Sequence, residues 1–338
     1  MRAIWHQSSG AIEFKEVVEP QIVSVEDVKV KVAYCTIGIQ DLRMQRAWDF
    51  YGKAGIAGYE MAGTIVAIGN KAKTAGFEIG QAVSGTVVHF CGKCLYCKQH
   101  QEHNCLNLQI NGGTLCDYLV WKADQLIKLP DSLSFRIGCL LEPVAVVNMA
   151  FEKLAITAND NVCIFGGDFN GLVLLQLIKL FTTAKVTIVE NKKNNQELAR
   201  KFGADYIVDF YSDNFETELL QISDFTGFTK TVLTVSAYPD LLNVAINATA
   251  RGGTCLTTVY FDPQQEITVN SIKFFAMNLT LTSSFLYTKT LLQQTAVLLQ
   301  KMKLDDLISQ EYSLTDFLDA YSIEQQQMFP RIGIKVDC

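Results

Sequence analysis

The sequence lacks any apolar run long enough to cross a membrane. Its longest apolar stretch, residues 172–181, is interrupted by Gln176 and Lys179 and reaches about half of the ~20 residues that a spanning helix needs. The N-terminus also lacks the pattern of a signal peptide, because one Arg is followed by alternating apolar and polar residues and a Ser-Ser-Gly turn, which is typical of a β-hairpin. We therefore expect a cytoplasmic protein without a membrane partner.

Positive charge is scarce as well. The chain has 29 Lys and Arg against 35 Asp and Glu, a formal net charge of -6, and no basic stripe, which argues against a nucleic-acid partner. Internal repeats and low-complexity linkers are missing. With 49% hydrophobic and 19% charged residues, the composition is that of an ordinary globular protein, and a small-molecule substrate is the expected partner.

A length of 338 residues exceeds what one hydrophobic core usually supports, so we expect two domains. Up to about Pro130, short alternating runs broken by glycines predict a mostly β domain. After about Ala150, strands such as NVCIFG alternate with helices such as NGLVLLQLIKLF, which predicts an α/β domain with a parallel, doubly wound sheet. The tail, with helical stretches near 290–302 and 314–327, is too short to fold alone and must pack on one of the two domains.

Four of the ten cysteines, Cys91, Cys94, Cys97 and Cys105, follow the spacing CxxCxxCx7C. In a reducing compartment such a cluster indicates a metal site and not disulfides. Four thiolates on a tight loop suit tetrahedral zinc and leave no open coordination position, so one structural zinc per chain is expected. An iron–sulfur cluster and unliganded thiols are the alternatives. The other six cysteines are interpreted as small buried apolar residues.

A candidate dinucleotide-binding turn follows the strand NVCIFG and opens a helix. Gly166, Gly167 and Gly171 supply glycines of a GxGxxG-like turn, but Asp168 stands at its second glycine position, where a negatively charged side chain would crowd and repel a pyrophosphate. Glu190 ends the next strand and is placed to accept the two ribose hydroxyls of NAD. The alternative is a domain of this topology that no longer binds a dinucleotide.

Several segments in order resemble the zinc-containing medium-chain dehydrogenase/reductases, most closely the sorbitol and threonine dehydrogenase branch. The segments are VKVKVAYCTIGIQDL, GYEMAGTIVAIG, the cysteine lobe, GGTLCDYLVWKADQLIKLPDSLSF, LLEPVAVV, FGGDFNGL, LARKFGAD and ARGGT. The resemblance implies a GroES-like catalytic domain over residues 1–148 and 287–338, with the zinc lobe at 91–105, and a Rossmann-like nucleotide-binding domain over 149–286. It also implies a homodimer or homotetramer.

In that family, a second zinc ion in the active site polarises the alcohol while hydride passes to NAD. Its ligands come from a GICGSD-like segment, a GHE segment and a later EP segment. Alignment of these segments puts Gly38 where the Cys stands and Tyr59 where the His stands, and retains Glu60 and Glu142. Two of the three usual ligands are missing, so the resemblance implies that the catalytic zinc is absent.

The proton relay of the family is altered too, because its Ser or Thr aligns with Gln40 and its His with Arg43. Cys35 is no substitute ligand, since it lies an odd number of residues before Gly38 along a strand and faces the other way. A buried Glu60 without a metal ion is expected to become protonated or to find a basic partner, for which Arg43 is the candidate.

Three functions are considered. The favoured one is an NAD(H)-dependent alcohol or polyol dehydrogenase-like oxidoreductase without catalytic zinc, in which Tyr59 donates a proton to the product; the alternative role for Tyr59 is to fill the volume left by the metal. The second is a non-catalytic binding or regulatory member that keeps the fold and the structural zinc. The third, an ordinary zinc polyol dehydrogenase, requires unusual ligands.

Overall fold

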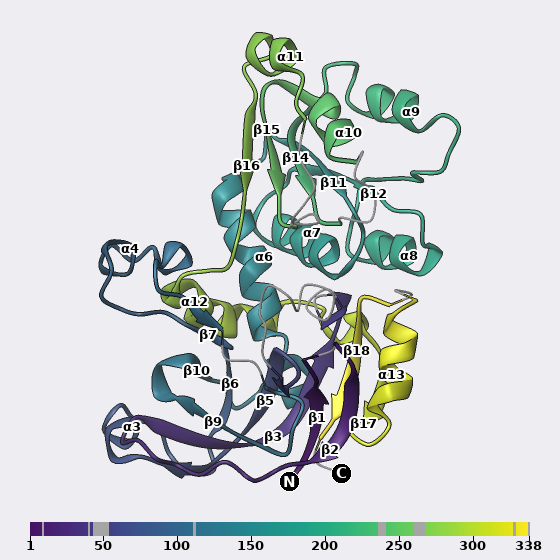
Figure 1. Cartoon of the computed structure of the whole chain (residues 1–338). Coiled ribbons are helices and arrows are strands. Elements are labelled where there is room, and N and C mark those ends of the chain that lie inside the picture. The colour runs from purple at the N-terminus through teal and green to yellow at the C-terminus, as the bar shows by residue number, and fades with distance from the viewer. Residues whose placement is uncertain are drawn as a thin grey trace. The chain divides into compact units, whose positions relative to one another are not determined.

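The computed structural model describes residues 1–8, 10–39, 41–42, 54–110, 113–235, 241–259, 268–326 and 329–336. The chain divides into two compact units. Figure 1 shows the chain coloured by residue number from the N-terminus to the C-terminus. The first unit contains residues 1–145 and 288–338, and the second contains residues 146–287.

The second unit is built on a six-stranded sheet in the order β13-β12-β11-β14-β15-β16, and every neighbouring pair in it is parallel. The strand order reverses between β11 and β14, which is the switch point where open α/β sheets bind ligands. The strands are β11 (Asn161–Phe165), β12 (Lys185–Val189), β13 (Tyr206–Val208), β14 (Phe228–Leu233), β15 (Thr249–Thr257) and β16 (Thr280–Ser283).

Helices connect these strands, as the alternation in the sequence predicts. They are α7 (Phe169–Phe181), α8 (Lys193–Lys201), α9 (Phe215–Ile222), α10 (Leu241–Ala248) and α11 (Ser271–Ala276). The short helices α9 and α11 were not predicted. Gly203, at φ 94°, follows the end of α8, as expected for a helix C-terminus. Large apolar side chains such as Phe165 and Phe228 fill the core between sheet and helices. The α/β fold class is confirmed.

The first unit is mostly β. A seven-stranded sheet has the order β10-β6-β5-β3-β18-β17, with β9 paired to β3, beside a three-stranded sheet β2-β1-β4 and the pair β7-β8. The strands are β1 (Arg2–His6), β2 (Ile12–Glu16), β3 (Asp27–Ile37), β4 (Gly55–Ile56), β5 (Glu60–Ile68), β6 (Ala82–Gly85), β7 (Val88–His89), β8 (Gln109–Ile110), β9 (Tyr118–Lys122), β10 (Leu126–Lys128), β17 (Ile308–Ser313) and β18 (Arg331–Lys335). The N-terminal hairpin β1–β2 is confirmed.

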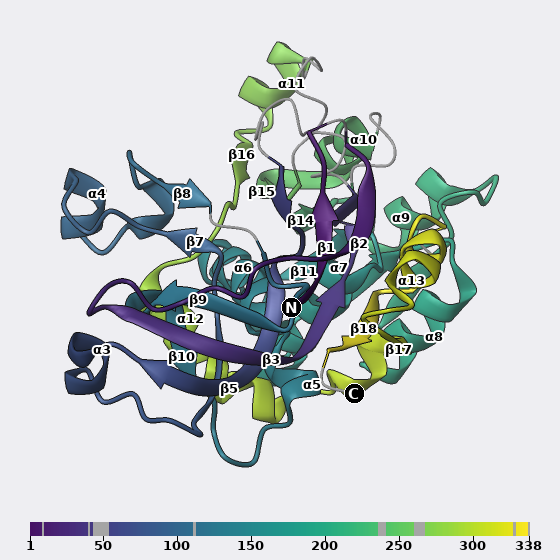
Figure 2. The same cartoon turned by 60° about the horizontal axis from the view of Figure 1, so that its bottom comes forward.

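The tail returns to the first unit, where β18 pairs antiparallel with β3 and parallel with β17 (Figure 2). Strand β3 therefore has β5 on one side and the C-terminal strand β18 on the other. The α-helices of this unit are α3 (Asn70–Thr74), α4 (Leu95–Lys98), α5 (Phe135–Gly138), α12 (Lys289–Leu298) and α13 (Phe317–Glu324), and α6 (Leu141–Leu154) runs from the first unit into the second.

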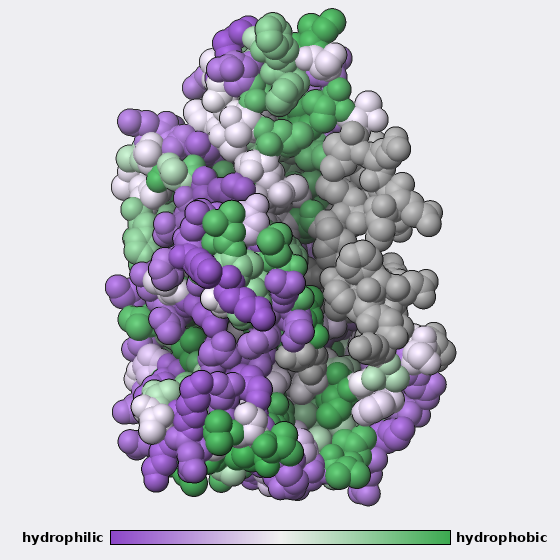
Figure 3. All heavy atoms as spheres, turned by 60° about the vertical axis from the view of Figure 1, so that its left-hand side comes forward, coloured by the Kyte–Doolittle hydropathy of each residue, from purple (hydrophilic) through white to green (hydrophobic). Residues whose placement is uncertain are grey.

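Apolar side chains gather on the surface of the second unit, over α11 (Figure 3). This helix buries none of its residues, and Ile272 and Phe275 are 77% and 86% exposed. The neighbouring strand β16 is the edge of the sheet and exposes Leu281. Within the described ranges, no helix combines the length and apolarity that crossing a membrane requires.

Candidate functional site

The four cysteines predicted to bind zinc lie together in the lobe between β7 and β8. Their Sγ atoms are all within 4.8 Å of one another, and Cys91 Sγ is 3.9 Å from Cys97 Sγ. A tetrahedral zinc ion with Zn–S bonds of about 2.3 Å holds its sulfurs about 3.8 Å apart. The four side chains therefore fit one zinc ion, whose coordination they would complete.

Backbone N–H groups favour the thiolate form of two of these cysteines. Hydrogen bonds from the N–H groups of Lys93 and Cys94 lower the pKa of Cys91, and the N–H of Cys97 lowers that of Cys94. Burial raises the pKa of Cys97. Because zinc binds thiolates, a loop that stabilises negative sulfur suits the metal.

A second cluster of chemical groups lies where β5 and β18 flank β3. Glu60 opens β5 and Arg331 opens β18, and their side chains form two hydrogen bonds, Nη2 to Oε1 at 3.0 Å and Nε to Oε2 at 3.2 Å. Both residues are buried, at 5% and 3% exposed. The Thr36 hydroxyl donates to Glu60 Oε2. The basic partner expected for Glu60 is thus Arg331, whereas Arg43 lies outside the described residues.

The Arg331 guanidinium occupies the space beside Gly38. A Cβ atom at Gly38 would lie 2.4 Å from Arg331 Nη1 and 2.7 Å from Cζ, so a Cys side chain could not stand there unless the arginine moved. Burial acts to lower the pKa of Arg331, but the Glu60 carboxylate outweighs it and raises this pKa. The guanidinium is therefore a permanent cation next to Gly38, the position that aligns with the cysteine ligand of the resembling family.

Asp41 adds a second carboxyl group to this cluster, and no motif in the sequence pointed to it. Its Oδ2 accepts a hydrogen bond of 2.9 Å from the N–H of Gly38, while its Oδ1 is buried and has no hydrogen-bond partner. Burial, reinforced by the negative charge of Glu60, raises the pKa of Asp41 to about 7. Near neutral pH this carboxyl group therefore exchanges a proton, while Glu60 is held by the arginine.

The other predicted catalytic residues are less closely defined. Tyr59 is half-buried and directly precedes β5, and Glu142 is half-buried in the first turn of α6. Gln40 lies outside the described residues. Cys35 is buried, and its thiol donates a hydrogen bond to the carbonyl oxygen of Thr114. Over the described part of the chain, the cysteine lobe is the only group of three or more His, Cys, Asp or Glu side chains close enough to hold a metal ion.

The glycine turn predicted from the sequence follows β11 at the switch point of the parallel sheet. Gly166 has a φ of 118°, and a Cβ at Gly171 would lie only 1.8 Å from the carbonyl oxygen of Gly166. Both positions therefore require glycine for the strand-to-helix turn itself. Asp168 is the N-cap of α7, and Glu190 lies beside the turn, where its Oε2 accepts the Gly167 N–H at 3.0 Å.

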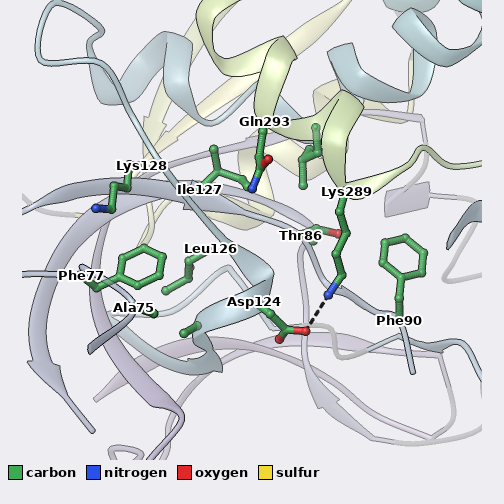
Figure 4. Close-up of a pocket in the computed structure, with 12 residues that line it drawn as sticks. Ala75, Phe77, Thr86, Phe90, Asp124, Leu126, Ile127, Lys128, Lys289 and Gln293 are labelled. Atoms are coloured by element: carbon green, nitrogen blue, oxygen red, sulfur yellow. Dashed lines mark hydrogen bonds and ion pairs between the residues drawn. The ribbon is translucent and has the colours of Figure 1, made fainter. Parts of the chain in front are cut away.

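A surface pocket of about 420 Å³ lies elsewhere on the first unit, lined by residues of β10 and α12 (Figure 4). Its charged groups are paired, since Lys289 Nζ is 2.7 Å from Asp124 Oδ2 and Lys128 Nζ donates to the carbonyl of Gly76. None of the residues in the clusters described above lines it. We assign it no function.

Two family models match the chain. The Alcohol dehydrogenase GroES-like domain matches residues 24–131, and the Zinc-binding dehydrogenase model matches residues 171–301. The first match lies within the first unit. The second match lies within the second unit, except for residues 288–301, which belong to the first unit.

Curated proteins and solved structures resemble the chain over most of its length. D-arabinitol dehydrogenase 1 of Uromyces fabae is 24% identical over 93% of this chain and 91% of its own length. L-threonine 3-dehydrogenase of Pyrococcus horikoshii is 30% identical over 67% of this chain and 66% of its own. A crystal structure described as a short chain alcohol dehydrogenase from Escherichia coli CFT073, complexed with the cofactor NADH, has a TM-score of 0.89 at 21% identity and covers 99% of both chains.

Replacing Arg331 by Met should destabilise the first unit strongly. The substitution leaves the Glu60 carboxylate buried without its cation, and breaking a buried pair in this way costs about 3–5 kcal/mol. The double variant R331M/E60Q should lose less, because no charge is then left unpaired. Urea unfolding of the wild type, both single variants and the double variant measures the coupling.

Lys71→Met is the control for this cycle, because it breaks the surface ion pair of Lys71 and Glu26. The side chain of Lys71 is 67% exposed and that of Glu26 is 46% exposed. The substitution should leave the free energy of unfolding nearly unchanged. Equal losses for R331M and K71M would contradict the structural role of the buried pair.

Proposed function

Because this chain belongs to the zinc-containing medium-chain dehydrogenase/reductase superfamily, we propose that it is an NAD(H)-dependent oxidoreductase that interconverts a small alcohol or polyol and its carbonyl product without catalytic zinc. The observation that carries the proposal is the Arg331 guanidinium, paired with Glu60 and in contact with the position of a Cβ at Gly38. The fold supports the reaction type, and the relatives support the substrate class.

The residues at the family's metal position do not fit a zinc ion. Gly38 offers no ligand atom, and Tyr59 stands in place of an imidazole. Glu60 already binds Arg331 through both oxygens. A zinc ion favours nitrogen and sulfur ligands, so the carboxylate of Glu142 alone would hold it weakly. No step of the proposed reaction therefore uses a second metal.

The substrate class is proposed from the relatives' names. D-arabinitol and L-threonine both carry a secondary hydroxyl group, whose oxidation to a ketone releases one hydride and one proton. A chain without catalytic zinc must handle that proton with its own side chains. This requirement makes the groups around Glu60 and Tyr59 the candidates for the chemistry.

The β11–α7 turn is the segment that would hold the dinucleotide, beside Glu190, whose carboxylate oxygens already accept four hydrogen bonds from the chain. The turn fits a phosphate-binding backbone, because Gly166 and Gly171 allow the strand to meet the helix closely. Asp168 places a negative charge at the start of α7, where it opposes the phosphates. When bound, the nicotinamide ring supplies the hydride acceptor or donor.

Tyr59 is the proposed proton donor during carbonyl reduction, with its hydroxyl proton passing to the substrate oxygen as hydride reaches the carbonyl carbon. The phenolate formed must then regain a proton. Asp41, whose pKa is raised to about 7 and which lies beside Gly38, is the proposed source of that proton. In the oxidative direction the same proton moves the other way.

The zinc proposed for the cysteine lobe has no part in this chemistry. Four sulfur ligands complete its coordination, and a closed site offers no position for a substrate oxygen. Its contribution is to hold the loop between β7 and β8.

A non-catalytic binding or regulatory role is the second candidate. The observation that favours it is the engagement of the turn's N–H groups by Asp168 and Glu190. If these carboxylates exclude the dinucleotide completely, hydride transfer is impossible.

We further propose that the chain forms homo-oligomers through the edge strand β16 and helix α11. Exposed apolar patches of this kind mark association surfaces, and an edge strand offers unpaired backbone groups to a second copy.

Zinc analysis should give about one ion per chain. The cysteine lobe is expected to hold it, so C94S/C97S should contain almost none. Plasma mass spectrometry of protein purified without added metal makes the measurement. A ratio near two zinc ions per chain in the wild type would show that a second zinc site exists and would contradict the proposal of a reaction without catalytic zinc.

Tyr59→Phe should lower kcat by about a hundredfold, because general acid catalysis contributes at least that much, and should change KM less. Steady-state oxidation of D-arabinitol and L-threonine with NAD provides the assay. Tyr96→Phe, in the cysteine lobe, is the control and should retain full activity. An unchanged kcat in Y59F would leave Tyr59 as a space-filling residue.

Phe275→Asp should shift the oligomer towards the monomer, since it puts a charge into the apolar surface over α11. Sedimentation velocity over a range of concentrations measures the shift. Phe225→Asp removes another exposed phenylalanine, outside α11 and β16, and should leave the association state unchanged. A wild-type chain that is monomeric at every concentration would contradict the proposed interface.

A further inference from the structure

The N–H groups of the glycine turn already have acceptors within the chain. Gly171 N donates to Asp168 Oδ1 at 3.1 Å, and Gly167 N donates to Glu190 Oε2 at 3.0 Å. Backbone N–H groups at this place are what a phosphate-binding turn offers to its ligand. Two carboxylates of the chain therefore use donors that a pyrophosphate would need.

Glu190 is held firmly in this arrangement. It is 6% exposed, and its Oε1 accepts the N–H groups of Asn191 and Lys192, both at 2.8 Å. Its Oε2 also accepts from Asn195 Nδ2 at 3.1 Å. With Gly167 these make four hydrogen bonds, which is about the full accepting capacity of a carboxylate. Glu190 is therefore a fixed part of the turn.

Asp168 is held differently. It has an extended backbone, with φ -74° and ψ -171°, and caps the 13-residue helix α7 through the Gly171 N–H. A negative charge at this end of a helix is stabilised by the helix dipole. The residue is only partly buried, and its carboxylate caps the helix end at which a phosphate-binding turn receives its ligand.

We propose that Asp168 is a built-in anion that takes the phosphate position at the start of α7 and thereby weakens the binding of dinucleotides to this chain. The inference rests on the proposed NAD dependence and names the residue that limits it. A dinucleotide brings two negative charges to the same helix end, so it must displace the Asp168 cap and bind despite the repulsion. Glu190 stays in place because its four donors hold it.

Two substitutions separate the charge of Asp168 from its capping bond. Asp168→Asn removes the charge and keeps an oxygen that can accept the Gly171 N–H. Asp168→Gly removes both and leaves the turn open. Removing a unit charge near the phosphates should tighten NADH binding about tenfold in D168N, and D168G should bind at least as tightly.

Fluorescence titration of NADH into the full-length protein measures these affinities, with calorimetry as a second method. Asn270→Gly is the matched control, because Asn270 caps α11 in the same unit by accepting the Lys273 N–H. It should leave the NADH affinity at the wild-type value. Thermal unfolding of each variant shows whether it is folded. If D168G does not fold, the NADH affinity of D168N decides the question.

Tighter NADH binding in D168N and D168G, with N270G unchanged, supports the proposal. Equal or weaker binding in both variants, when the wild type binds NADH, overturns it and leaves the NAD-dependent function intact. Failure of the wild type and both variants to bind NADH overturns the proposal and the NAD-dependent function together, and the non-catalytic role then takes its place.

Discussion

The buried pair of Glu60 and Arg331 is the constraint on which the first unit's chemistry depends. It links β5 to the C-terminal strand β18 across β3, and thus joins residues that are 271 positions apart in the sequence. Each charge would be very costly to bury alone, but two hydrogen bonds between the groups and a third from Thr36 offset that cost. The pair therefore stays intact in the folded unit, and it determines the surroundings of the neighbouring residues.

The consequences appear at Gly38 and Asp41. A side chain at Gly38 would have to displace the guanidinium, which lies where a Cβ would project. Burial, together with the negative charge of Glu60, raises the pKa of Asp41 to about 7, and Arg331 offsets this rise only in part. A permanent cation, a fixed carboxylate and a titratable carboxyl group thus share one small region. This set can exchange a proton near neutral pH, which a reaction without catalytic zinc requires.

Local patterns in the sequence predict much of this structure, and distant pairings do not. The spacing of Cys91 to Cys105 and the alternation of strands and helices after residue 150 are short-range signals, and the structure agrees with both. The short helix α11 was missed because its six residues are fewer than two helical turns. Arg331 was missed because its role depends on β18 pairing with β3, which only the folded chain makes visible.

In each unit, a charged side chain of the protein lies where the family would place a charged ligand, but the two side chains differ in how deeply they are buried. In the first, the buried Arg331 guanidinium pairs with Glu60 and lies beside Gly38. A zinc ion at this place would need new ligands at positions 38 and 59 and a new place for Arg331. In the second, Asp168 supplies the negative charge that a cofactor's phosphates would bring, but it is partly exposed and held by its helix-capping bond. One substitution suffices to remove that anion. The zinc-free chemistry that we propose therefore depends on the buried core of the first unit, whereas the proposed barrier to dinucleotides depends on the side chain of Asp168.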